Sequence, residues 1–365
     1  MNELKKLLIK RKLLLVIALG LALKVVLCLM ETPAPPLQPP SSQSEYEQIL
    51  ANLAGPLTPE KKAFFTEEEE RRAAYQEAME AVWDRYDNGE ISEEELGSQL
   101  SAVSNPAEVS DETWAYLQNQ YAYIQEDPTL HYFIRQDGWV NVLGNQSLDY
   151  ILLLLILIIS GTGITYEYES GMAELLWTYR KGQKQLIASK LACILLLCTG
   201  VFLLSEGITA LNEILRYGPL PNAPLQSLRM FQNSSLQVDL ITVYLASRGY
   251  RLLGVLMTAA ITMFLAVLGR RAVTALFGGL VFAVVPYFLW GGKDILFRCP
   301  NPAGLLIGNG YFFSDILDSS GAVFFKAVTS TGHILTIGFT VLCLCLLSAD
   351  TILLFKRTQE RRRQA

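Results

Sequence analysis

The sequence has little histidine, and its two histidines belong to no metal-binding pattern. His131 and His333 stand alone, and neither an HExxH motif nor a CxxC pair is present among the 365 residues. Zinc sites need three or four His, Cys or carboxylate ligands at short, regular spacing. The sequence therefore predicts no metal site.

Phosphate-binding and nucleophile motifs are also missing. No GxxxxGK[ST] loop and no GxSxG turn occurs anywhere in the chain. The first motif cradles the phosphates of ATP, and the second presents a catalytic serine. We therefore predict neither catalytic nor cofactor-binding residues, and we expect that the chain is not itself an enzyme.

Apolar residues are abundant, and they gather in six long segments. Hydrophobic residues make up 51% of the chain. A helix that crosses ~30 Å of hydrocarbon needs about 20 predominantly apolar residues. The sequence predicts an all-α, polytopic membrane protein with six transmembrane helices and a small helical extracytoplasmic domain. The predicted spans are Leu13–Met30, Tyr150–Thr165, Leu186–Leu204, Leu252–Leu268, 272–290 and Ile334–Phe355.

Basic residues cluster where six spans place them on one side of the membrane. They lie in the N-terminal MNELKKLLIKRK, the central loop, the turn Arg270-Arg271 and the tail KRTQERRRQA. Positively charged loops stay in the cytoplasm. We therefore expect a multi-pass protein of the cell (plasma) membrane with both termini cytoplasmic.

The charge between the first two spans has the opposite sign. Residues 31–148 hold 22 Asp and Glu but only six Lys and Arg. This balance excludes nucleic acid as a partner, because the phosphate backbone attracts basic proteins. We predict three parts: 1–30 with the first span, an acidic helical extracytoplasmic domain over 31–148 with a Pro-rich tether, and 149–365 with the other five spans.

Three helix start signals occur in this acidic domain. Thr58 precedes Pro59 at a helix start, Ser92 and Glu95 form a capping box, and Ser110 carries a third capping pattern. The third helix has an aromatic-rich stripe. These signals predict helices beginning near positions 59, 93 and 111.

A few polar residues lie within or beside the predicted spans. Lys24 lies inside the first, and it either reaches the outer surface, contacts another helix or belongs to a substrate pathway. Asp350 lies in the inner half of the last span, where it can either pair with a basic neighbour or have a functional role. We place Arg248 and Arg251 at the outer rim after a short interfacial helix, and we expect an interfacial or re-entrant helix after Pro302.

The central stretch 166–190, YEYESGMAELLWTYRKGQKQLIASK, separates two apolar segments. Its pattern E-x-x-x-G-x-x-x-x-L-x-x-x-x-R-K-G-Q-x-x-x-x-x-S-K-L resembles the type 2 permeases of ATP-binding-cassette exporters. The six-span plan and the turn LGRRAVTALFGGL are also similar to that family. The enlarged domain between the first two spans departs from its compact members.

The resemblance implies that the 166–190 loop forms a coupling helix on a separate ATPase subunit. Carried over, the docking residues are Glu167, Glu169, Met172, Trp177, Arg180 and Lys181. The implied function is export of a hydrophobic, lipid-like or peptide-like substrate. Because six spans form half a pathway in this family, a homodimer or a heterodimer with a similar permease is also implied.

Two other interpretations remain open on the residues alone. The central loop can be an ordinary amphipathic helix whose basic end meets lipid phosphates. The chain can also be a non-transporting sensor or assembly protein whose acidic ectodomain binds a ligand or a protein partner.

Overall fold

The computed structural model describes residues 12–30, 43–103, 107–144, 147–169, 183–232, 234–289, 301–308, 313–317, 323–327 and 330–364. The chain divides into two compact units. Unit 1 comprises Met1–Ala34, Gly138–Leu220 and Asn233–Ala365, and unit 2 comprises Pro35–Asp137 and Pro221–Gln232. The acidic unit is therefore built from two separate stretches of sequence.

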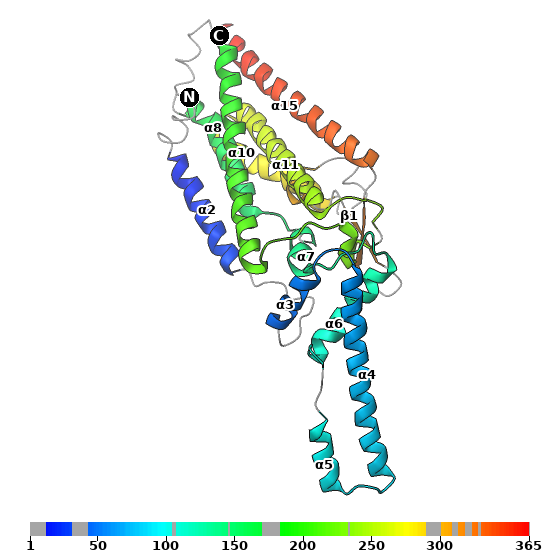
Figure 1. The fold of residues 1–365 in the computed structure, drawn as a ribbon. Helices are drawn as coiled ribbons and strands as arrows, with labels where there is room; N and C mark the ends of the chain where they lie inside the picture. The colour runs from blue at the N-terminus through cyan, green and yellow to red at the C-terminus, as the bar shows by residue number, and fades with distance from the viewer. Residues whose placement is uncertain are drawn as a thin grey trace. The chain divides into compact units, whose positions relative to one another are not determined.

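Unit 1 is a bundle of apolar helices (Figure 1). Its helices are α2 (Leu13–Met30), α7 (Gln136–Gly144, which begins in unit 2), α8 (Tyr150–Glu169), α10 (Gln183–Tyr217), α11 (Leu240–Gly269), α12 (Ala272–Leu289), α14 (Pro302–Ile307) and α15 (Ser330–Gln364). One continuous hydrophobic cluster joins α2, α8, α10, α11, α12 and α14.

Helix α11 is the centre of this bundle, because it packs against α8, α10, α12, α14 and α15. Gly254 permits its close approach to α14. A Cβ atom at this position would lie 2.6 Å from the backbone nitrogen of Leu306. The short helix α14 is fully buried and begins at Asn301, whose side chain accepts the Ala303 N–H at 2.9 Å. The predicted short helix after Pro302 is thus confirmed.

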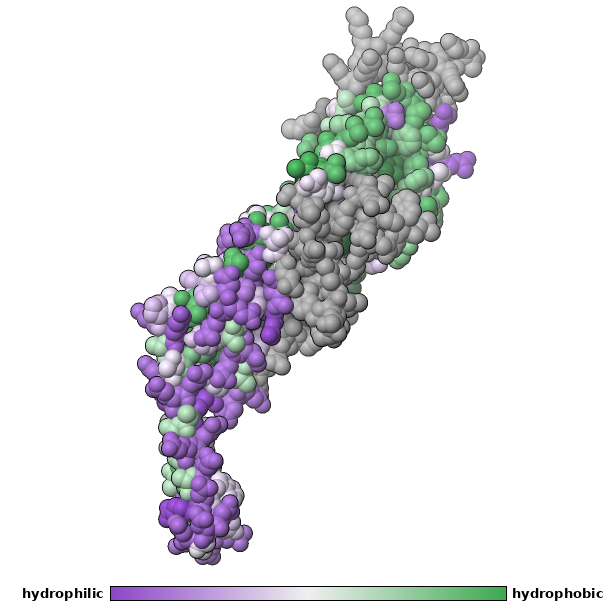
Figure 2. All heavy atoms as spheres, turned by 90° about the vertical axis from the view of Figure 1, so that its right-hand side faces the viewer, coloured by the Kyte–Doolittle hydropathy of each residue, from purple (hydrophilic) through white to green (hydrophobic). Residues whose placement is uncertain are grey.

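Four helices of the described part are long and apolar enough to cross a membrane: Leu13–Met30, Ile187–Tyr217, Leu240–Gly269 and Thr331–Leu354. Tyr150–Tyr166 and Ala272–Pro286 are shorter apolar helices. These features indicate a membrane protein. Figure 2 shows hydrophobic side chains over much of the visible face of unit 1.

Helices α10 and α11 are among those that extend beyond the spans predicted from the sequence. The third apolar segment ends not at Leu204 but at Tyr217, and α11 runs without a break from Leu240 through the region predicted as a separate interfacial helix. That prediction was wrong because Arg248 and Arg251 have carboxylate partners inside the bundle. The helix can therefore carry them without leaving it.

The described residues also include β structure, namely a hairpin and an isolated bridge between Gly55 and Phe133. Strand β1 (Phe313–Leu317) pairs antiparallel with β2 (Val323–Ala327), and Asp315 lies opposite Phe325. The all-helical prediction holds for the rest of the described chain.

Unit 2 contains α3 (Gln43–Leu53), α4 (Pro59–Asp87), α5 (Glu93–Ala102) and α6 (Asp111–Glu126). The starts of its last three helices confirm the predicted positions. Thr58 accepts the Lys61 N–H at 3.4 Å, and the Ser92–Glu95 capping box is complete. Ser110 makes no side-chain cap, because its hydroxyl donates instead to Glu45 at 2.7 Å.

An aromatic core holds unit 2 together. Phe65 of α4 is fully buried and stacks on Tyr121 of α6, with ring centroids 4.0 Å apart. Phe133 also stacks on Phe65, with ring centroids 5.6 Å apart. The second stretch contributes as well, since the Tyr123 hydroxyl donates to the Gln226 carbonyl at 2.5 Å. The aromatic stripe predicted for the third helix thus forms part of this core.

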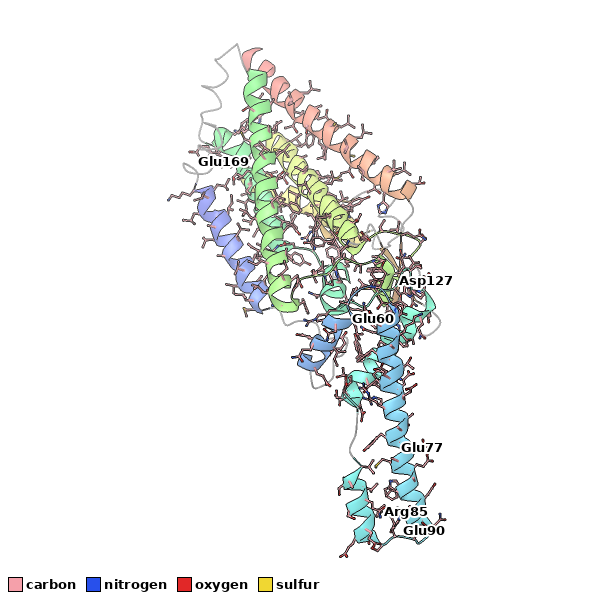
Figure 3. The ribbon with its side chains drawn as sticks, viewed as in Figure 1. Glu60, Glu77, Arg85, Glu90, Asp127 and Glu169 are labelled. Carbon is pink, nitrogen blue, oxygen red and sulfur yellow. The ribbon has the colours of Figure 1, made fainter. Side chains whose placement is uncertain are left out.

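The far half of α4 and the helix α5 form a separate small cluster of Val82, Ile91 and Leu96. Acidic side chains cover this part of unit 2, and Figure 3 shows Glu77 and Glu90 projecting from it. Figure 2 shows unit 2 as mainly hydrophilic on the visible face. The Pro-rich tether predicted before Gln43 lies outside the described residues.

Candidate functional site: a buried charge cluster

The structure describes only part of the predicted docking segment. Glu167 and Glu169 lie in the last turn of α8, and the side chain of Glu167 is outside the described residues. Met172, Trp177, Arg180 and Lys181 also lie outside them. Only Glu169 can therefore be placed with its contacts.

Glu169 connects two helices of unit 1. It is exposed at the end of α8 (Figure 3), and its carboxylate accepts the backbone N–H of Ala272 at 2.8 Å. Ala272 is the first residue of α12. Free N–H groups at a helix start attract a negative charge, so Glu169 caps α12 from another helix.

A second site gathers charged side chains at the opposite end of α8. The Lys24 ammonium on α2 lies 2.5 Å from a carboxylate oxygen of Asp149 and 2.5 Å from the Ser205 hydroxyl on α10. Only 8% of the Lys24 side chain and 15% of the Asp149 side chain are exposed. Asp149 also accepts the Leu152 N–H at 2.9 Å, which caps the start of α8.

Two arginines of α11 extend this cluster. Arg251 lies 3.7 Å from Asp149 and 3.1 Å from Glu206 of α10. Arg248 contacts the other oxygen of Glu206 at 2.9 Å and lies over the Tyr244 ring. One carboxylate thus serves two guanidinium groups. Burial of such charges is costly unless they are paired, so the cluster fixes how α2, α8, α10 and α11 meet.

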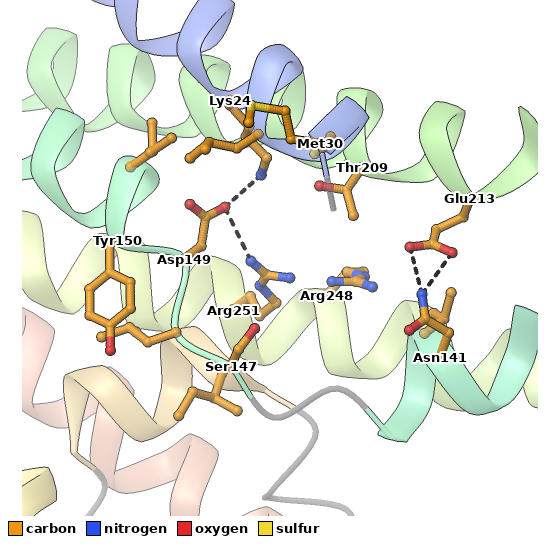
Figure 4. A pocket seen from close by; sticks show the side chains of 16 residues that line it. Lys24, Met30, Asn141, Ser147, Asp149, Tyr150, Thr209, Glu213, Arg248 and Arg251 are labelled. Atoms are coloured by element: carbon orange, nitrogen blue, oxygen red, sulfur yellow. Dashed lines mark hydrogen bonds and ion pairs between the residues drawn. The ribbon is translucent and has the colours of Figure 1, made fainter. Parts of the chain in front are cut away.

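A cavity of about 460 Å³ opens beside these residues. Figure 4 shows Lys24, Asp149 and Arg251 joined by ion pairs along its wall, with Arg248 next to Arg251. Further along, Asn141 of α7 donates to both oxygens of Glu213, at 3.0 and 3.1 Å. Apolar side chains complete the lining, among them Leu27, Met30 and Ile307. A charged wall facing apolar walls suits an amphiphilic molecule.

From the sequence we singled out Lys24, Arg248 and Arg251, but not Asp149 or the cluster that these residues form. Lys24 was predicted to face another helix or the surface, and it contacts a residue 125 positions away. Arg248 and Arg251 were predicted only to lie at the outer rim of the membrane. The available signal was that basic and acidic residues occur at the same ends of adjacent predicted spans.

Two further polar residues lie on α15. His333 of α15 forms a hydrogen bond with the Tyr250 hydroxyl of α11, at 2.8 Å from its Nδ1 atom. Asp350 is exposed on α15. Among the residues that the structure describes, no group of three or more His, Cys, Asp or Glu side chains is placed to hold a metal ion.

Comparison of the chain with protein-family models, with curated proteins and with solved structures finds no match.

Proposed function

We propose that the chain is the membrane-spanning permease subunit of an ATP-binding-cassette exporter. It has six spans, and both termini are cytoplasmic. A separate ATPase subunit docks on the 166–190 loop, and two permease chains pair to form the pathway. The substrate is hydrophobic, lipid-like or peptide-like.

The observation that carries the proposal is the position of the 166–190 segment between two packed apolar helices. It joins the end of α8 to the start of α10, and these helices share the hydrophobic cluster of unit 1. Glu169 further connects the segment to the start of α12. A push on this segment would therefore reach three helices directly. The sequence resemblance predicts that the subunit acting on this segment is an ATPase. The missing phosphate loop agrees with this prediction, because ATP would then be bound by a separate subunit.

Co-purification tests the proposal. The tagged full chain is co-expressed with an ATPase subunit encoded beside it, and the bound ATPase is quantified. The proposal expects the double variant Arg180→Glu/Lys181→Glu to lose the ATPase. Arg361→Glu/Arg362→Glu, which reverses the same charge in the basic tail, is the matched control and should retain it. Equal retention by both variants would refute docking on this loop.

A second candidate function is a membrane sensor or assembly protein, and the independent fold of unit 2 favours it. Unit 2 has its own aromatic core and an acidic extension formed by the far half of α4 and α5. Replacing residues 78–104 by a Gly-Ser linker removes this extension and leaves the aromatic core intact. If the chain is a sensor, this variant should no longer capture its partner in a crosslinking assay. If the chain is the exporter subunit, the variant should still bind the ATPase.

A further inference from the structure

We infer that segment 221–232 is a strap through which changes in unit 2 reach helices α10 and α11 of unit 1. The segment connects these helices in the sequence, since α10 ends at Tyr217 and α11 begins at Leu240. It nevertheless packs in unit 2, which the chain enters after Leu220 and leaves after Gln232. The inference goes beyond the proposed function and holds whether the chain is an exporter or a sensor.

Apolar side chains anchor the strap. It contains two short 3₁₀ helices, η2 (Leu225–Ser227) and η3 (Arg229–Phe231). Leu225, Leu228 and Phe231 are fully buried. Detachment of the strap would expose this apolar surface, so the hydrophobic effect holds the strap in its packed position.

Polar contacts fix the strap to α6 and to the residues that follow α6. The Tyr123 hydroxyl of α6 donates to the Gln226 carbonyl at 2.5 Å. The Ser227 hydroxyl accepts the Tyr132 N–H at 3.0 Å and donates to the Leu130 carbonyl at 3.3 Å. A buried N–H that loses its acceptor is costly. The Ser227 side chain therefore holds the strap at two points.

Helix α7 connects the strap to α10 by a second route. Its first residue, Gln136, donates from its side-chain amide to the Ser227 carbonyl at 3.4 Å. Five residues further along α7, Asn141 donates to both oxygens of Glu213 of α10, at 3.0 and 3.1 Å. The strap is thus joined to α10 through side chains as well as through the chain itself.

The two helices that the strap connects also share a buried carboxylate. Glu206 of α10 pairs with Arg248 and Arg251 of α11. A chain spans at most about 3.5 Å per residue, so the short connections from Tyr217 to the strap and from the strap to Leu240 limit how far they can move apart. A partner that binds unit 2 and shifts the strap would therefore pull on both helices of this pair.

Hydrogen exchange of the purified full chain in a non-ionic detergent tests the inference. Ser227→Ala removes both hydroxyl contacts and should raise the exchange rates of the amides in 221–232 about tenfold. Transmission through the strap should also raise exchange at least about threefold in 211–217 of α10 and in 243–248 of α11. Exchange in 262–268, at the far end of α11, should stay unchanged.

The matched control is Ser101→Ala. The Ser101 hydroxyl is exposed on α5 of the same unit and donates to the Ser98 carbonyl at 2.8 Å. Its removal should leave exchange unchanged in the strap and in both helix ends. An equal rise at the helix ends in this control would overturn the specific role of the strap.

A second variant keeps the test decisive if loss of the Ser227 hydroxyl is tolerated. Phe231→Ala removes a fully buried anchor, so it should free the strap. Faster exchange in 221–232 with no change in 211–217 or 243–248 would mean that the strap opens alone, and it would overturn the inference. Unchanged exchange in 221–232 in both variants would overturn the anchoring.

Discussion

The ion pair between Lys24 and Asp149 gives the sharpest prediction about unit 1. Lys24→Met keeps the length of the side chain and removes its charge. Asp149→Asn keeps an oxygen for the Leu152 N–H and also removes the charge. Removing one partner of a buried pair costs about 3–5 kcal/mol, because the other charge stays buried without compensation. Since the Asp149 side chain is 15% exposed and also lies 3.7 Å from Arg251, we expect each single variant to lose only about 3 kcal/mol, the lower end of this range.

The double variant decides whether the two residues act as a pair. With both charges removed, neither is left uncompensated, so the loss should fall short of the sum of the single losses by about 2 kcal/mol. Chemical unfolding of the purified chain, followed by tryptophan fluorescence, measures the free energies. The exposed pair Arg85 and Glu90, 3.7 Å apart, is the control, and its removal should cost less than about 1 kcal/mol. Additive losses, within about 0.5 kcal/mol, would refute the pairing of Lys24 with Asp149.

Three further predictions concern packing and pH. Gly254→Ala should destabilise unit 1 by about 1–3 kcal/mol, because the added Cβ would meet the backbone of α14. Gly249→Ala is the control and should cause no such loss, since a Cβ there meets no atom within 4 Å. Chemical unfolding compares the two variants. Phe65→Ala should cost unit 2 about 3–5 kcal/mol and abolish its near-ultraviolet circular dichroism, since the side chain is fully buried. Hydrogen bonds from the Ser92 N–H and hydroxyl hold the pKa of Glu95 below its usual value in the folded protein. The stability that this gives is present above the pKa of Glu95 in the unfolded chain and is lost as pH falls through its folded pKa. Glu95→Gln should therefore reduce the loss of stability in an acid titration, and an acid profile identical to that of the unchanged protein would contradict the capping box.

Local signals in the sequence were sufficient for the helices of unit 2. Thr58 and Ser92 lie at predicted helix starts because a cap depends on residues within three positions of it. Ser110 shows where this reasoning stops, since its hydroxyl binds Glu45, 65 positions away. The membership of Pro221–Gln232 in unit 2 was equally invisible, because no local pattern ties that stretch to α6.

Contacts between residues far apart in the sequence also explain why the buried charge cluster was not predicted. Hydropathy identified the apolar segments, but we placed Arg248 and Arg251 at the outer rim because isolated charges are costly inside a bundle. Their cost is offset by partners on other helices, and the sequence does not state which helices are neighbours. The position of Lys24 opposite Asp149 likewise depends on how α2 packs, which periodicity alone leaves open.

The contacts at the two ends of α8 differ in strength, and this difference has a mechanical consequence. At its start, Asp149 binds α2, α11 and its own first turn, through side chains that are mostly buried. At its end, the exposed Glu169 makes a hydrogen bond to the first residue of α12. Breaking a buried ion pair costs several times more than losing an exposed cap. A force on the segment after Glu169 would therefore move the weakly held ends of α8 and α12 first, and the charge cluster beside the cavity would act as the fixed point.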